Sequence, residues 1–102
     1  MIIISELKKK VVEKSTINKL VNKIWKYVKN LIEKGMDSLG AYDEAIKDYE
    51  LGEEIIITYE IEAKKAGLIN HLDLKYDDIK KLKKRVKKTL FDKALKDFNN
   101  KK

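Results

Sequence analysis

The sequence predicts an all-α protein of one domain, in which two similar helical motifs share one core. Three observations lead to this fold class. Apolar residues recur with the 3.6-residue period of a helix, glycines stand where helices are expected to end, and several blocks of sequence return in the same order about fifty residues later. The chain also contains no proline, the residue that most often interrupts a helix.

Length and composition favour a single domain over residues 1–102. Hydrophobic residues make up 43% of the chain, which is enough for one compact core. A motif of ~50 residues without a disulfide or a metal rarely buries enough surface to be stable alone. We therefore expect the two motifs, residues 1–51 and 52–102, to pack against each other.

The first motif is expected to contain three helices. Apolar positions at helical spacing predict a short helix over residues 2–14, and Ser15 and Thr16 offer an N-cap for a second helix. Gly35 should end that second helix, and Asp37 should begin a third. Each of these two helices is expected to bury one apolar stripe. The stripe of the second helix consists of Ile17, Leu20, Val21, Ile24, Val28, Leu31 and Ile32. The stripe of the third helix consists of Tyr42, Ala45, Ile46 and Tyr49.

The second motif opens with a segment whose flanks and contents disagree. The segment begins with Glu53 and Glu54, whose negative charge complements the positive end of a helix dipole. It is followed by Gly67, a residue that commonly ends a helix. Ile55–Ile61, however, is rich in β-branched residues and would suit a strand. We favour a helix because both flanks are helix signals. The alternative is an α+β fold with Ile2–Ile4 and Ile55–Ile61 as strands.

A long final helix is predicted after the acidic pair Asp77 and Asp78, which suit its first turn. Its apolar stripe is expected to consist of Ile79, Leu82, Val86, Leu90, Ala94 and Phe98.

The two motifs are related by an apparent internal duplication. The clearest block is Tyr42–Tyr49 (YDEAIKDY), which returns as Phe91–Phe98 (FDKALKDF) with four identical positions. Ile17–Leu20 (INKL) returns in the same order as Ile69–Leu72 (INHL). Chance similarity in a chain rich in lysine and isoleucine is the competing explanation. A duplication predicts a seam between the motifs, and concave binding sites tend to form at such seams.

The residues of catalytic and cofactor sites are largely missing. Cysteine is absent and His71 is the only histidine, which excludes thiolate and multi-histidine metal sites. Gly35–Gly40 has the glycine spacing of a P-loop, but Ala41 and Tyr42 stand where lysine and a hydroxyl residue are required. We therefore predict no enzymatic activity, no cofactor and no metal.

Aromatic residues define the first functional hypothesis, a non-enzymatic module that binds a peptide or protein segment between the two motifs. Aromatic side chains in such a groove would anchor the partner, and nearby lysines would favour an acidic one. Burial in the core is the alternative role for them. The candidate groove residues are Trp25, Tyr27, Tyr42, Tyr49 and Tyr76.

A basic segment defines the second hypothesis, a small nucleic-acid-binding protein. The chain carries 24 basic and 17 acidic residues, a net charge of +7. Leu82 and Val86 would face inward on a helix, so that the cations between them could meet phosphates. A solvated helix face is the alternative. The candidate phosphate contacts are Lys80, Lys81, Lys83, Lys84, Arg85, Lys87 and Lys88.

Composition also suggests a biological source. A short chain without cysteine, with lysine and isoleucine in excess and no enzyme motif, resembles the small orphan proteins of filamentous viruses of hyperthermophilic archaea, of the Acidianus lipothrixvirus type. The resemblance implies an intracellular viral protein in the host cytoplasm, and it assigns no activity. No apolar run approaches the roughly 18 residues that span a bilayer, so we expect a cytoplasmic protein without a membrane partner.

Overall fold

The computed structural model describes residues 4–68 and 74–100, and every regular element within them is a helix. The elements are α1 (Ile4–Glu33), α2 (Ser38–Asp48), α3 (Leu51–Lys65) and α4 (Tyr76–Asn100). The predicted all-α class is thus confirmed. A strand over Ile55–Ile61 is wrong, because this run lies inside α3. Of the other proposed strand, Ile2–Ile4, only Ile4 is described, and it begins α1; Ile2 and Ile3 lie outside the described residues.

Packing explains why an isoleucine-rich segment is helical. The buried side chains of α3 include Ile55, Tyr59 and Ala63, which recur every four residues and so form one helical stripe. Glu53 and Glu54 occupy the first turn of α3, where carboxylates meet the positive end of the helix dipole. Burial of this stripe and the matched helix ends outweigh the weak β-preference of isoleucine.

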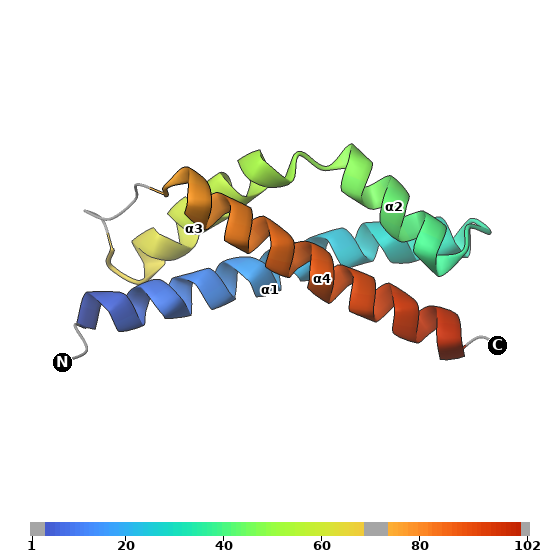
Figure 1. Ribbon diagram of the computed structural model, residues 1–102, viewed down its shortest axis with the longest axis horizontal. Helices are drawn as coiled ribbons and strands as arrows, with labels where there is room; N and C mark the ends of the chain where they lie inside the picture. The colour runs from blue at the N-terminus through green and yellow to red at the C-terminus, as the bar shows by residue number, and fades with distance from the viewer. Residues whose placement is uncertain (1–3, 69–73, 101–102) are drawn as a thin grey trace.

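The four helices form an elongated bundle of 49 × 25 × 22 Å. The long helices α1 and α4 cross near the middle of the molecule, while α3 and α2 lie at its two ends (Figure 1). α3 runs beside the first half of α1, and α2 packs against α1 and α4 at the other end. One contiguous core of buried side chains draws on all four helices.

The predicted break between two helices at Ser15 and Thr16 is wrong, because α1 continues through it. Thr16 is fully buried, and its hydroxyl donates a 2.7 Å hydrogen bond to the backbone carbonyl of Val12, one turn earlier. A threonine can either cap a helix or bond back to the preceding turn in this way. In this protein the Thr16 hydroxyl bonds back to the preceding turn, so its hydrogen-bonding capacity is met while α1 continues without a break.

The other predicted helix ends are confirmed. Gly35 follows α1 with a φ of +106°, a backbone conformation that side chains disfavour. Asp37 is the N-cap of α2, and its carboxylate accepts a 2.6 Å hydrogen bond from the backbone N–H of Gly40. Gly67, with a φ of +80°, ends the turn after α3.

Most of the predicted core is confirmed in α1 and α4, although Leu31, Ile32, Ile79 and Phe98 are only partly buried, and the core is shifted in α2. The residues of the α4 stripe that are buried include Leu82, Val86 and Leu90. In α2 the buried side chains are small ones, such as Ala41 and Ala45, while the aromatic residues of its predicted stripe are only partly covered. The short side chains of α2 let its backbone lie close to α1 and α4.

The two halves of the chain arrange their helices differently. Residues 4–48 form a 30-residue helix followed by an 11-residue helix, whereas residues 51–100 form a 15-residue helix followed by a 25-residue one. Trp25 and Tyr76, which the duplication would align at an offset of 51 residues, also differ in setting, because Trp25 packs against the core and Tyr76 is 72% exposed. The internal duplication therefore stays a prediction from the sequence.

Candidate functional site

A surface groove lies where α2 passes into α3, opposite the first half of α4. Its volume is about 540 Å³, which is within the usual range of ligand-binding sites. Ile46, Lys47 and residues 49–53 line one side, and the other side is lined from α4 by Tyr76, Ile79, Lys83 and Lys87. The groove thus lies at residue 51, where the predicted motifs join.

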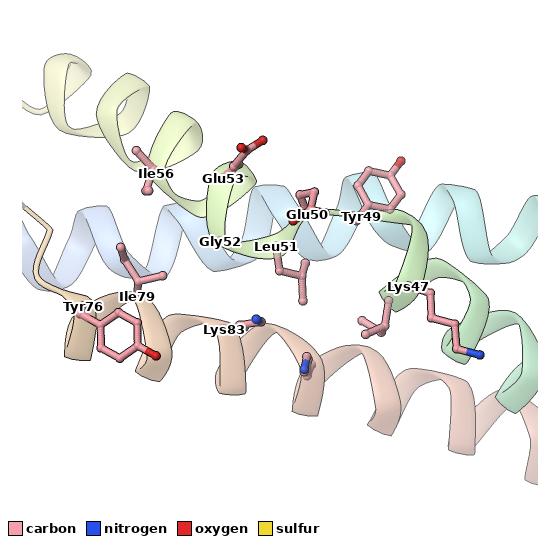
Figure 2. Close-up of a pocket in the computed structure, with 12 residues that line it drawn as sticks. Lys47, Tyr49, Glu50, Leu51, Gly52, Glu53, Ile56, Tyr76, Ile79 and Lys83 are labelled. Carbon is pink, nitrogen blue, oxygen red and sulfur yellow. The ribbon is translucent and has the colours of Figure 1, made fainter.

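Apolar side chains form the inner surface of the groove. Leu51 is buried and points from the α2–α3 junction toward α4, and Ile79 stands opposite on α4 (Figure 2). Gly52 also lines the groove and has open space beside it, since a Cβ atom placed there would meet nothing within 4 Å. Ile46 and Ile56 complete the apolar lining. Such a surface favours an aliphatic or aromatic side chain of a partner.

Tyr49 at one end of the groove is held by its neighbours. Its ring packs edge-on against the ring of Tyr27, with the centroids 5.6 Å apart. The Tyr27 hydroxyl donates a hydrogen bond to the carboxylate of Asp48, and this bond raises the pKa of the Tyr27 phenol above its ordinary value. The Lys23 ammonium lies 5.9 Å from the centre of the Tyr49 ring, within cation–π range. These contacts restrain the Tyr49 ring.

Charge is arranged unevenly around the groove. Lys83 and Lys87 are partly buried on the α4 side, with their aliphatic stems along the groove. Glu50 and Glu53 lie on the α3 side, and Figure 2 shows the Glu53 carboxylate directed away from α4. Within the described residues neither of these two lysines forms a salt bridge. Their ammonium groups are therefore available to an anionic group.

The structure brings only part of the predicted aromatic set together. Tyr49 and Tyr76 line the groove, and Tyr27 supports Tyr49 from outside it. Tyr42 lies elsewhere, with its ring edge-on to that of Phe91 at 5.6 Å, and Trp25 lies under the ammonium of Lys93 at 5.7 Å. The five aromatic residues therefore do not line one common groove.

The basic segment lies on α4 as the helical pattern predicts. Leu82 and Val86 are buried, so the cations between them project outward. Lys80, Lys81, Lys84, Arg85 and Lys88 are exposed, while Lys83 and Lys87 turn toward the groove.

The part of the chain that the structure describes holds no group of three or more metal-ligating side chains. His71 lies outside the described residues. Among residues 4–68 and 74–100, no helix combines the length and apolar character needed to cross a bilayer.

Sequence reasoning missed the apolar lining of the groove. The sequence placed Ile79 on the apolar stripe of the final helix and Ile56 in the β-branched run Ile55–Ile61, and Gly52 was given no role in a site. The available signal was the run Tyr49–Gly52, in which a glycine close to a predicted helix start leaves space beside an aromatic ring.

Comparison with family models, with curated proteins and with solved structures finds no match for this chain. The resemblance to proteins of archaeal filamentous viruses stays a prediction from composition.

Proposed function

We propose that this protein is a non-enzymatic interaction module that holds a segment of a partner protein in the groove between the α2–α3 junction and α4. One observation carries the proposal: an apolar hollow at residue 51 lies beside two lysines that have no anionic partner within the described residues. A hollow of this kind suits one or two apolar side chains, and the lysines suit an acidic neighbour of them.

The chemistry of the partner follows from the lining. An aliphatic side chain would occupy the space beside Gly52, against Leu51 and Ile79. A carboxylate nearby would meet the ammonium groups of Lys83 and Lys87, which are four residues apart and thus on one face of α4. We therefore expect a short segment in which aliphatic and acidic residues alternate.

The internal duplication belongs to the same proposal. If the chain arose from two copies of one motif, the groove is the seam between residues 1–51 and 52–102, since it is lined from both sides of residue 51. The proposed partner site does not depend on this history.

The test uses a pool of short fluorescent peptides that combine aliphatic residues with aspartate or glutamate. Fluorescence anisotropy should show saturable binding to the wild-type protein and weak binding to Gly52→Trp, whose side chain would fill the groove. The double variant Lys83→Glu/Lys87→Glu should also lose binding. Lys29→Glu/Lys34→Glu carries the same change of charge on exposed lysines outside the groove and should bind like the wild type. Equal binding by all variants would contradict the proposal.

Nucleic-acid binding by α4 is the second candidate function. It rests on the burial of Leu82 and Val86, which directs five exposed cations of this segment to solvent. Retention of a DNA duplex should fall steeply between about 50 and about 200 mM salt. The variant Lys80→Glu/Lys84→Glu/Lys88→Glu changes exposed lysines that do not line the groove, and it should abolish retention. Salt-independent retention, or retention by this variant, would exclude this function.

A further inference from the structure

The α4 side of the groove changes in character along its length. Tyr76, Ile79, Lys83 and Lys87 follow one another at intervals that keep them on one face of α4. The first two side chains are an aromatic ring and an aliphatic group, and the last two are cations. A segment that lies along this line therefore meets apolar side chains at one end and positive charge at the other.

The opposite side of the groove has the same polarity. Ile56 lies near the end that Tyr76 and Ile79 mark, whereas Lys47 lies at the other end, beyond Lys83 (Figure 2). Both sides of the groove thus change from apolar to basic in the same direction.

Two glutamates also line the groove, and they leave this polarity in place. Glu50 and Glu53 belong to the side formed by the α2–α3 junction, and the Glu53 carboxylate is directed away from α4. Within the described residues neither glutamate forms a salt bridge. Lys47, Lys83 and Lys87 outnumber them in the lining, so its net charge is positive.

The spacing along α4 matches every second residue of an extended chain. Ile79 and Lys83, and likewise Lys83 and Lys87, are about 6 Å apart along the helix axis, because each residue of a helix adds about 1.5 Å. In an extended chain alternate side chains point the same way and stand about 6.7 Å apart. Three side chains on one side of an extended segment can therefore lie opposite these three residues of α4.

The size of the groove favours an extended occupant over a helical one. The line from Tyr76 to Lys87 is roughly 16 Å long. A helix of that length, about 10 Å in diameter, would occupy more than twice the 540 Å³ of the groove. An extended segment of about five residues has the same length and a thinner backbone.

We propose that the partner segment is an extended run of about five residues, with an aliphatic side chain at one end and carboxylates two and four residues further along. The aliphatic side chain packs between Ile56 and Ile79, and the carboxylates meet the ammonium groups of Lys83 and Lys87. The two residues between these positions face away from the groove. The proposal rests on the proposed function, and it narrows the partner from a composition to a spacing.

Fluorescence anisotropy with end-blocked, labelled peptides tests the spacing. Leu-Ser-Glu-Ser-Glu and Leu-Glu-Ser-Glu-Ser have the same composition, but only the first places its Leu and both Glu side chains on one side of an extended chain. Each is made in both chain directions, because the groove fixes the order of side chains and not the direction of the backbone. The better direction of the first peptide should bind about fivefold more tightly than either direction of the second, since two partly exposed ion pairs differ.

A variant of the farther lysine tests the register. Lys87→Gln should weaken binding of the first peptide, and it should leave unchanged the binding of Leu-Ser-Glu-Ser-Ser, which lacks the last carboxylate. Lys84→Gln is the control, since Lys84 is exposed on the same helix and does not line the groove. Far-ultraviolet circular dichroism should remain helical for both variants.

The outcomes separate this spacing from the proposed function. Equal binding of the matched peptides, or equal effects of Lys87→Gln on peptides with and without the last carboxylate, would overturn the spacing and leave the groove as a binding site. Tighter binding of a longer peptide with the same three side chains at every fourth residue, as a helix presents them, would do the same. Saturable binding by no peptide at all would contradict the proposed function and the spacing with it.

Discussion

The ammonium of Lys19 lies 2.8 Å from the carboxylate of Glu62, an ion pair that joins the middle of α1 to the last turns of α3. The Glu62 side chain is 9% exposed, and the ammonium of Lys65 lies 3.5 Å from the same oxygen. The hydrogen bond from Lys19 lowers the pKa of Glu62 below the ordinary 4.5, against the effect of burial. The pair also raises the pKa of Lys19. A nearly covered carboxylate thus stays charged.

Replacing Glu62 by glutamine should therefore destabilise the protein in a pH-dependent way. Because the pKa of Glu62 is lower in the folded state, the ion pair contributes stability above pH 4.5, and this contribution is lost as the pH falls through the folded pKa. The melting temperature of Glu62→Gln should be lower than that of the wild type at neutral pH, and the difference should vanish in strong acid. Glu60→Gln, at an exposed position, is the control. A difference that does not change with pH would contradict this role.

Replacement by alanine should have opposite effects on the stability of the protein at two of its glycines. Gly35 has a φ of +106°, so Gly35→Ala should destabilise the protein by about 1 kcal/mol through backbone strain alone, since no atom lies near the added methyl group. Gly52 lies in the first turn of α3 with open space around it, so Gly52→Ala should stabilise the protein by about 0.5–1 kcal/mol. Urea unfolding curves of both variants measure the two effects. Shifts of the same sign would show that one helix boundary is misplaced.

Ile24 should be among the most sensitive core positions. It is fully buried on α1, in the contiguous core that unites the helices. Ile24→Ala leaves a cavity and should lower the free energy of unfolding by about 2–5 kcal/mol. Ile57→Ala removes the same atoms from an exposed face and should change it by less than about 0.5 kcal/mol. Chemical denaturation compares them, and equal costs would contradict the assignment of buried and exposed helix faces.

Tyr27 should titrate at higher pH than an unperturbed tyrosine. Its hydroxyl donates to the Asp48 carboxylate, and loss of the proton would place two negative charges side by side, so the pKa lies above 10.0. Asp48→Ala should bring the pKa of this phenol back down, and Glu33→Ala, an exposed acid away from this contact, should not. Nuclear magnetic resonance of labelled tyrosine rings follows the titration. An unchanged Tyr27 pKa in Asp48→Ala would rule out the hydrogen bond.

The helix periodicity of the sequence was the most reliable guide to the fold. The buried positions Leu82, Val86 and Leu90 follow directly from the 3.6-residue pattern, because a single helix face meets the core along α4. The helix ends at Gly35 and Asp37 could be predicted because each has one local cause, a backbone conformation or a capping carboxylate.

What the sequence could not reveal depends on contacts between distant helices. Thr16 offers either a cap or a bond to Val12, and only its burial in the bundle selects the second. The pairing of Lys19 with Glu62 joins residues 43 positions apart, for which the sequence gives no signal. The groove could not be predicted from the sequence for the same reason, because it forms only when α4 lies opposite the α2–α3 junction.

The most direct test of the proposed interaction module is a map of where the aliphatic–acidic peptide pool binds on the isotopically labelled protein. Two-dimensional amide spectra recorded during titration should show the largest shifts at the groove, around Tyr49, Gly52, Ile79 and Lys83, with the end of α1 near Gly35 unchanged. Largest shifts outside the groove, or no shifts at saturating peptide, would contradict the account.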